Sequence, residues 1–330
     1  MADTKTLTIS IAAYNVAQTI TECLESCLGC KQADLLDIIV VDDGSSDDTA
    51  RIVETFVRRF PNTVRLVSKP NGGYGSTFNT SIEIARGRYF RLLDGDDWVD
   101  AKGLDELVRA LKSVDVDVAI APFVERSANE YSIIDQALLD TCGKVAFEGN
   151  IIPSNLSMHS ICYRTELVQS LDYELPEHRL YTDTLYNVIP LQLVKSAYVT
   201  HTPVYQYRVG RVGQSISKES LAAHYEDFYL MVCELFFLWQ GLENKESLPA
   251  HVLKAWLAID ATWLLHIMCD SMTVPTQELF DLMDLLAEDA EIYQMCSKRS
   301  LAFRTMARLP RFMFPIFIKA YRVRHWIHDN

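Results

Sequence analysis

The sequence of 330 residues lacks several features that would assign it to a common class of protein. Its 31 basic residues are outnumbered by 44 acidic ones, and the formal net charge of -13 argues against a general nucleic-acid binder. No stretch approaches the roughly 20 apolar residues of a membrane span, and no signal peptide is recognised. Neither a Gly-Lys-Ser/Thr phosphate loop nor a glycine triplet after the first apolar run is present. These absences favour a globular cytoplasmic protein that handles phosphates by other means.

A second Cys-x-x-Cys pair is also missing. Cys27 and Cys30 have the spacing of a zinc knuckle, but a structural zinc site needs two further ligands. Cys23 and Cys27 share one face of a predicted helix, which favours packing. We therefore expect the eight cysteines to be reduced and mostly buried.

Apolar runs alternate with amphipathic segments over the first 121 residues. The alternation predicts a parallel, right-handed, doubly wound α/β sheet. Strands are predicted at 7–13, 37–41, 64–67, 89–93 and 116–121, and helices from 20, 47, 76 and 100 onward.

Polar clusters follow four of these strands, at the edge where open sheets of this kind bind ligands. Carboxylates can accept from a base or a ribose, and glycines permit close backbone approach. Three carboxylates after the fourth strand repel one another, so a divalent cation would explain their assembly, although an Asp-Gly pair can also form a simple hairpin turn. The clusters are Tyr14-Asn15, Asp42-Asp43-Gly44, Asn71-Gly72-Gly73 and Asp94-Gly95-Asp96-Asp97.

These clusters, with Ser10-Ile11-Ala12-Ala13 before the first and Ser45-Ser46-Asp47-Asp48-Thr49 after the second, resemble the family 2 glycosyltransferases of the GT-A fold. The resemblance implies an inverting enzyme that takes a sugar from a UDP-sugar with Mn²⁺ or Mg²⁺. It implies that Asp94 and Asp96 bind the metal, with Asp96 the first choice. Two positions depart from the family pattern, Ala13 for a frequent Pro and Phe78 for a frequent basic residue. The implied nucleotide-sugar-binding residues are Ala13, Tyr14, Asn15, Asp42, Asp43, Asn71, Gly72, Gly73, Asp94, Gly95, Asp96, Arg208 and Arg211.

An inverting displacement needs a base to take the proton of the acceptor hydroxyl. The segments at 160–167 and 181–186 resemble the family pattern in which an Asp acts as this base, and Asp183 occupies that position. Thr182 replaces the usual acidic neighbour. Asp183 could also cap a helix over 184–194. Alternative bases are Glu174, Glu177 and His178.

The segment at 205–217 resembles a family loop that closes over the diphosphate through Arg208 and Arg211. A surface turn carrying Arg208 is the simpler alternative. His159 stands near the expected acceptor side, where a satisfied buried histidine would serve as well.

The last third of the chain is helical in pattern and rich in aromatic residues. We rank packing within the molecule first, a homo-oligomer face second and an acceptor groove third. Between 298 and 328 the chain has eight Lys or Arg and no Asp or Glu, which suggests peripheral contact with an anionic membrane or docking on the protein's own acidic surface.

The sequence thus predicts a GT-A core at 1–125, an acceptor-side region at 126–218 and a mainly helical region at 219–330. The predicted function is transfer of a sugar to a glycan, polymer or lipid-linked acceptor in cell-surface polysaccharide synthesis, at the inner face of the membrane. Alternatives are a sugar-phosphate nucleotidyltransferase and an inactive scaffold with the same fold.

Overall fold

The computed structural model of the protein describes residues 5–127, 129–136, 142–146, 156–210, 214, 217–271 and 276–329. The chain forms two compact units, unit 1 (Met1–Arg211) and unit 2 (Val212–Asn330). The predicted regions 1–125 and 126–218 fall mainly in unit 1, and the roles assigned to them stay predictions.

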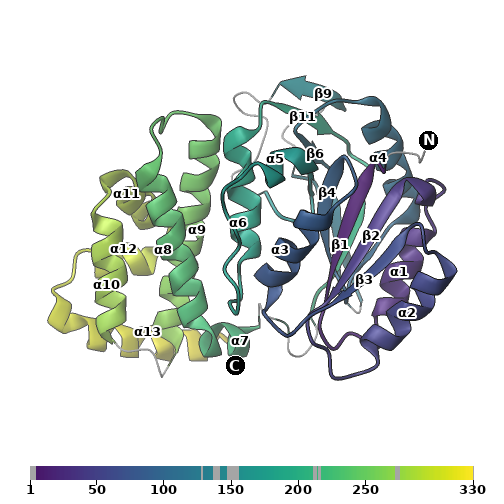
Figure 1. Ribbon diagram of the computed structural model, residues 1–330. Helices are drawn as coiled ribbons and strands as arrows, with labels where there is room; N and C mark the ends of the chain where they lie inside the picture. The colour runs from purple at the N-terminus through teal and green to yellow at the C-terminus, as the bar shows by residue number, and fades with distance from the viewer. Residues whose placement is uncertain are drawn as a thin grey trace. The chain divides into compact units, whose positions relative to one another are not determined.

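In the described part of unit 1, an eight-stranded sheet has the order β3-β2-β1-β4-β10-β6-β11-β9 (Figure 1). The first four strands of this order run parallel, whereas β10 is antiparallel to both β4 and β6. The predicted doubly wound, mostly parallel sheet is confirmed. Its strands are β1 (Leu7–Ala13), β2 (Leu36–Asp42), β3 (Val64–Ser68), β4 (Tyr89–Asp94), β6 (Val118–Ile120), β9 (Gly143–Ala146), β10 (Ile161–Arg164) and β11 (Ser196–Val199).

The strand ladder aligns the carboxyl ends of β1 to β4. Ala13 pairs with Asp42, and Asp42 pairs with Ser68. On the other side of β1, Ala12 pairs with Asp94. All seven residues of β2 are buried, as expected for a strand covered on both faces. The polar clusters that follow these strands therefore lie along one rim of the sheet.

Helices cover both faces of the parallel strands, α1, α2 and α4 on one and α3 with α5 on the other (Figure 1). Helix α2 shows why: Val53 and Phe56, three residues apart, are buried, while Arg58 is exposed. The helix bounds are α1 (Ile20–Leu28), α2 (Thr49–Arg59), α3 (Tyr74–Ile84), α4 (Ala101–Ser113), α5 (Thr165–Gln169) and α6 (Asp183–Val188).

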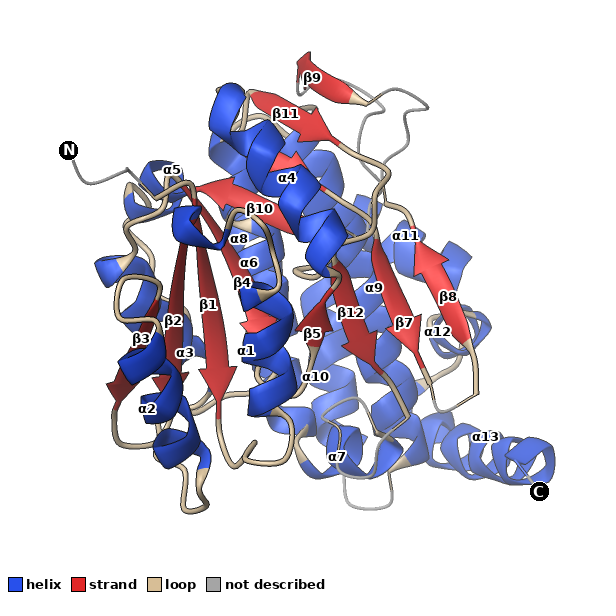
Figure 2. Ribbon diagram, turned by 90° about the vertical axis from the view of Figure 1, so that its right-hand side faces the viewer, coloured by secondary structure: helices blue, strands red, loops and turns tan. Residues whose placement is uncertain are grey.

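A second sheet in unit 1 has the order β5-β12-β7-β8 (Figure 2). Gln206 of β12 pairs with Trp98 of β5, so the chain near 205–208 lies beside the segment that follows Asp97. The predicted loop at 205–217 therefore begins as a strand. The strands are β5 (Trp98–Val99), β7 (Phe123–Arg126), β8 (Tyr131–Ile134) and β12 (Tyr205–Arg208).

Unit 2 is helical in its described residues, as the pattern predicted. Its interior is built around Trp239, which is fully buried and donates from Nε1 to the Asp289 carboxylate at 2.9 Å. Phe236 and Phe228 are also buried, so most of the aromatic stripe packs within the unit. The helices are α7 (Lys218–Ala223), α8 (Tyr225–Gly241), α9 (Leu248–Asp270), α10 (Thr276–Ala287), α11 (Ala290–Arg299), α12 (Leu301–Met306) and α13 (Phe314–Asp329).

Helix α9 bears on the expectation that no segment of the chain could span a membrane. By length and composition alone it could cross a membrane, since it has 23 residues and an apolar window with a mean hydropathy of 1.4. The sequence contained no continuous apolar run of that length because polar residues such as Asp260 and His266 interrupt it. Within the structure 61% of the window is buried, which is typical of a core helix.

Candidate active site

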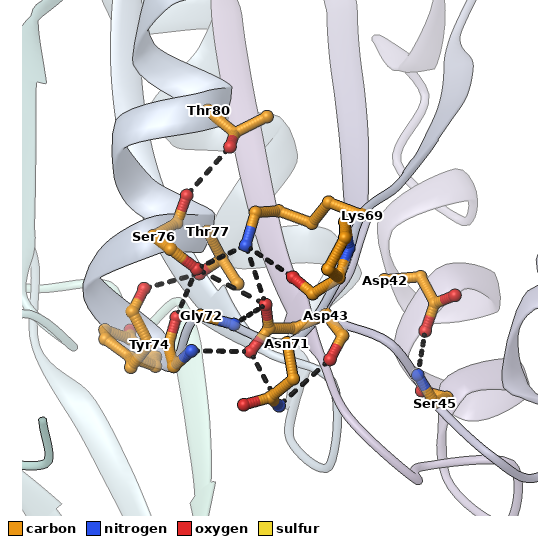
Figure 3. A network of polar contacts seen from close by, with 12 residues as sticks. Asp42, Asp43, Ser45, Lys69, Asn71, Gly72, Tyr74, Ser76, Thr77 and Thr80 are labelled. Atoms are coloured by element: carbon orange, nitrogen blue, oxygen red, sulfur yellow. Dashed lines mark hydrogen bonds and ion pairs between the residues drawn. The ribbon is translucent and has the colours of Figure 1, made fainter. Parts of the chain in front are cut away.

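The Asp43 carboxylate, at the end of β2, holds the next loop in place (Figure 3). It is 3% exposed, and its Oδ1 accepts from the Lys69 ammonium at 3.0 Å and the Gly72 N–H at 2.8 Å. Its Oδ2 accepts from the Gly73 N–H at 2.8 Å and the Asn71 side-chain amide at 3.0 Å. The protein therefore satisfies both oxygens, and the predicted cluster at 71–73 is brought to Asp43 by hydrogen bonds.

Gly73 needs to be glycine at this point. Its φ is +81°, in the left-handed region that other residues rarely adopt, and it immediately precedes α3. The turn allows consecutive N–H groups to point at one carboxylate.

The residues after β1 are placed differently. Tyr14 is 55% exposed at the rim, whereas Ala13 is buried in the strand. Asn15 has a φ of +53°, and its side-chain oxygen accepts from the Ser46 N–H at 2.8 Å. Of these three, Tyr14 presents a free aromatic face that could stack on a base.

Asp42 and Gly95 complete the strand-end set. Asp42 is 4% exposed and accepts from the Ser45 N–H at 3.1 Å. The Gly95 N–H donates to the carbonyl of Ala12 at 2.9 Å, so the turn after β4 is tied back to β1. Asp42 and Gly95 therefore fix the turns that follow β2 and β4.

Phe78 gives a physical reason for one departure from the family pattern. It is 5% exposed and packs edge-on against Phe90 and Tyr186, with ring centroids 5.8 and 5.5 Å apart. The Phe78 ring therefore packs in the interior rather than at the rim. Lys69, which follows the third strand and was not predicted to bind the nucleotide sugar, supplies a cation at the rim, where it pairs with Asp43.

A group that could hold a metal ion lies at the end of β4. In the described part of the chain it consists of Asp94, Asp97 and His159, whose candidate ligand atoms all lie within 4.8 Å of one another. Asp96, the predicted first choice, is half-buried and does not belong to this group. Its role as a ligand stays a prediction, and so does that of Asp94, which belongs to this group.

The carboxylates of this group are held in a poorly solvated place. Burial, together with the charges of Asp97 and Asp183, raises the pKa of Asp94 to about 7. Burial also raises the pKa of Asp97 to about 6. Asp94 Oδ1 is buried and accepts no hydrogen bond from the described residues. A buried acceptor without a donor, next to a second carboxylate, fits a divalent cation as its missing partner.

His159 completes the group as a neutral ring. Burial, reinforced by the charge of Arg91, lowers the pKa of His159 to about 3. Its Nδ1 lies 2.6 Å from Ser157 Oγ, and the ring stacks on Tyr207 with centroids 4.4 Å apart. A neutral imidazole fixed in this way can offer a nitrogen lone pair to a metal.

Strand β12 braces the acidic turn. The Tyr205 hydroxyl donates to Asp97 Oδ2, and the Arg208 N–H donates to Asp97 Oδ1, both at 2.8 Å. The Arg208 guanidinium stacks over Trp98 at 4.5 Å and pairs with Glu22 at 2.7 Å. Arg208 is thus anchored at the edge of the site, while Arg211 lies outside the described residues.

Asp183 faces the same site from another element. It is the first residue of α6, and Thr182 rather than Asp183 occupies the N-cap position. The Asp183 carboxylate nevertheless accepts from the N–H groups of Asp183 and Thr184 at the start of the helix. The α-helix also ends at Val188, earlier than expected, because Pro190 starts a separate 3₁₀ turn (Pro190–Leu193). Desolvation raises the pKa of Asp183, and its charge acts on Asp94.

Helix α3 fixes the segment that leads to Asp183. The Asn79 side chain makes two hydrogen bonds of 2.9 Å with the backbone of Leu175. The His178 N–H donates to the Gly72 carbonyl at 2.5 Å. A Cβ on Gly75 would stand 2.2 Å from the Pro176 carbonyl oxygen, so this close approach needs glycine. The segment at 175–178, which leads to Asp183, is therefore held both by α3 and by the loop at 71–73.

The alternative bases are less well placed. Glu174, Glu177 and His178 are exposed, whereas Asp183 is half-buried. Only Asp183 among these four raises the pKa of Asp94 by its charge.

The fold is that of a glycosyltransferase of the GT-A type. Residues 8–170 match the family described as glycosyl transferase family 2, so the family that the motifs predicted is confirmed over this part of the chain.

Similar proteins agree with this assignment. EpsH of Bacillus subtilis (strain 168), which carries a glycosyltransferase name, is 25% identical over 218 residues, 63% of this chain and 62% of EpsH. The chondroitin synthase of Escherichia coli is 38% identical over 99 residues, 30% of this chain and 14% of that protein. The matched segments thus span less than two thirds of either relative.

Among solved structures, S. aureus TarS 1–349 has the same fold, with a TM-score of 0.65 at 20% identity. The match covers 97% of this chain and 88% of that one. A structure of TarS 1–349 in complex with UDP-GlcNAc matches with a TM-score of 0.62 at 19% identity, 97% of this chain and 88% of that one. The predicted GT-A fold is confirmed.

Proposed function

We propose that the protein is a metal-dependent, inverting glycosyltransferase that moves a sugar from a UDP-sugar to a glycan, polymer or lipid-linked acceptor in cell-surface polysaccharide synthesis. The observation that carries the proposal is the meeting of Asp94, Asp97 and His159 with Asp183 at the carboxyl end of β4. The complex of TarS with UDP-GlcNAc supports the choice of donor.

The donor nucleotide is proposed to lie along the ends of β1 to β4. The exposed ring of Tyr14 would stack on the uracil, and the Asn71–Gly73 loop would approach the nucleotide through its backbone. Because the Asp43 carboxylate is already satisfied, its contribution is to hold that loop rather than to accept from the base directly.

Asp94, Asp97 and His159 would hold the Mn²⁺ or Mg²⁺ ion, with Asp96 as a further predicted ligand. When bound, such an ion neutralises the diphosphate and the charge that develops as UDP leaves. Because Asp94 Oδ1 is buried, water would screen this interaction less than at an exposed carboxylate.

Asp183 is the proposed base. It would accept the proton of the acceptor hydroxyl as that oxygen attacks the anomeric carbon and the bond to UDP breaks on the opposite face. Its pKa is raised by desolvation, so its carboxylate is a stronger base than one in water. The attack from the opposite face inverts the anomeric centre.

The experiment that tests the proposal measures UDP release from a panel of nucleotide sugars, with Mn²⁺ and with chelator. Release that requires both the metal and an acceptor supports transfer. Release of pyrophosphate from a nucleoside triphosphate and a sugar phosphate would instead identify a nucleotidyltransferase. UDP binding without release in any condition would favour the inactive scaffold, for which Thr182 is the one supporting feature.

Cytoplasmic location, at the inner face of the membrane, stays part of the same proposal. It follows from the expected use of cytoplasmic nucleotide sugars. Fractionation of the natural host with an antibody to this chain would test it.

A further inference from the structure

One exposed face at the start of α13 combines apolar and basic side chains. We define the α13 outer face as Arg308, Arg311, Phe312, Ile316 and Lys319. Phe312 is 77% exposed and Ile316 is 61% exposed, which places them among the most exposed large apolar side chains of the described chain. The three cations of the face are exposed as well.

The exposure follows a helical period. A short 3₁₀ turn (Arg311–Met313) leads directly into α13. Positions 311–312, 315–316 and 319–320 are exposed, whereas Phe314 and Ile318 between them are 3% and 7% exposed. The buried side packs within unit 2, where α13 contacts α9 (Figure 1). The outer face is therefore a defined side of an ordered helix, not an unpacked end.

The charge of this region has one sign. Residues 298–328 include eight Lys or Arg and no Asp or Glu, in a chain with a formal charge of -13. Arg311 pairs with the Asp284 carboxylate. Arg308 and Lys319 make no ion pair with any described residue. Two of the three cations of this face are therefore not paired with an acid within the described structure.

We propose that the α13 outer face docks on an anionic lipid surface. Exposed Phe and Ile side chains can enter the boundary between headgroups and acyl chains, and adjacent Lys and Arg bind the lipid phosphates. A second copy of the chain fits less well, because a two-fold contact would bring the same cations against each other. The proposal goes beyond the transfer reaction and does not depend on it.

Vesicle sedimentation tests the proposal with the full chain. The protein is mixed with phosphatidylcholine vesicles, and with vesicles that also contain phosphatidylglycerol, at low and high salt. We expect binding only to the anionic vesicles, weakened by salt because the Debye length shortens. Equal binding to both vesicle types, or to neither, overturns it.

Two pairs of variants locate the contact. The double variant Phe312→Ser/Ile316→Ser should lose most vesicle binding, whereas the matched exposed pair Leu230→Ser/Phe237→Ser on α8 should retain it. Arg308→Gln/Lys319→Gln should lower the partition coefficient by roughly tenfold or more, from the contribution of each basic residue near an anionic surface. Lys31→Gln/Lys112→Gln, exposed on unit 1, is the charge-matched control.

Two further readouts keep the result decisive. The far-UV circular dichroism spectrum and the thermal unfolding midpoint should be unchanged in all four variants, which shows that they fold. Light scattering should give the same mass for the parent and for Phe312→Ser/Ile316→Ser. A parent dimer that this variant dissociates would assign the face to self-association and overturn the lipid proposal.

Discussion

The pKa of each carboxylate in this site depends on how deeply the chain buries it and on which charges lie nearby. Asp94 and Asp97 crowd together beside a neutral His159, which suits them to share a cation. Asp183 lies farther along the same site, at the start of α6, where desolvation strengthens it as a base. Two kinds of carboxylate in two environments are the usual way in which a site divides charge stabilisation from proton transfer.

Asp183→Asn tests this division. The amide keeps the shape of the side chain but cannot take a proton, so turnover should fall by about 10²-fold or more while UDP affinity stays nearly unchanged. Turnover is measured by UDP release, and affinity by calorimetry with Mn²⁺. Asp172→Asn, on an exposed residue of the same unit, is the control. Full activity of Asp183→Asn would remove the residue from its proposed role.

The pH dependence of turnover should also report the ionisation of Asp183. A base works deprotonated, so turnover should rise with pH through the pKa of Asp183. Since desolvation raises that pKa above the ordinary carboxyl value of 3.8, the acidic limb should lie above 3.8. Turnover at saturating donor, acceptor and metal, measured from about pH 3.5 to pH 9, locates the limb. If the chemical step limits turnover and turnover does not change with pH over this range, Asp183 is not the base.

Among the elements, the parallel strands were the most predictable. Their apolar runs are long, they alternate with amphipathic helices, and parallel pairing brings their carboxyl ends to one rim whatever the details of packing. The antiparallel strand β10 was not predicted. Its four residues pair with β4 and β6 across large sequence separations, and no local pattern specifies such a partner.

The site was predictable to the same extent. Strand ends and family motifs singled out Asp94, Asp183 and the loop at 71–73, whose roles stay predictions. Asp97 belonged to the predicted three-carboxylate cluster but was not named as a ligand, and His159 was expected near the acceptor. Their places beside Asp94 depend on side-chain directions set by β12 and by the residues before β10. The hydrogen bonds that satisfy Asp43 depend on Lys69, whose role only the folded loop reveals.

Gly75→Ala tests how α3 supports the segment before α6. The added Cβ would stand 2.2 Å from the Pro176 carbonyl oxygen, so backbone must move. We expect a loss of about 1–3 kcal/mol in the free energy of unfolding, measured with urea, and reduced turnover because Asp183 shifts. Gly241→Ala is the matched control, since its Cβ would meet nothing within 4 Å. That change near the end of α8 should be neutral or stabilising by up to about 1 kcal/mol.

For the molecule as a whole, the two units have separate interiors. The parallel sheet and its helices form the core of unit 1, and every residue of the candidate site among those described belongs to that unit. Unit 2 has its own core around Trp239. This division predicts that damage to the core of unit 2 changes stability without changing the chemistry of the donor site.

Trp239→Ala tests that division. The substitution removes a fully buried ring and the hydrogen bond from its Nε1 to Asp289, and it should cost about 3–5 kcal/mol of unfolding free energy. Trp263→Ala, on a ring that is 49% exposed, should cost much less. UDP affinity in the presence of Mn²⁺, measured at a temperature where both variants are folded, should match that of the parent protein. If the affinity instead falls with stability across the two variants, the donor site depends on the helical unit, and unit 2 takes part in catalysis rather than only in docking.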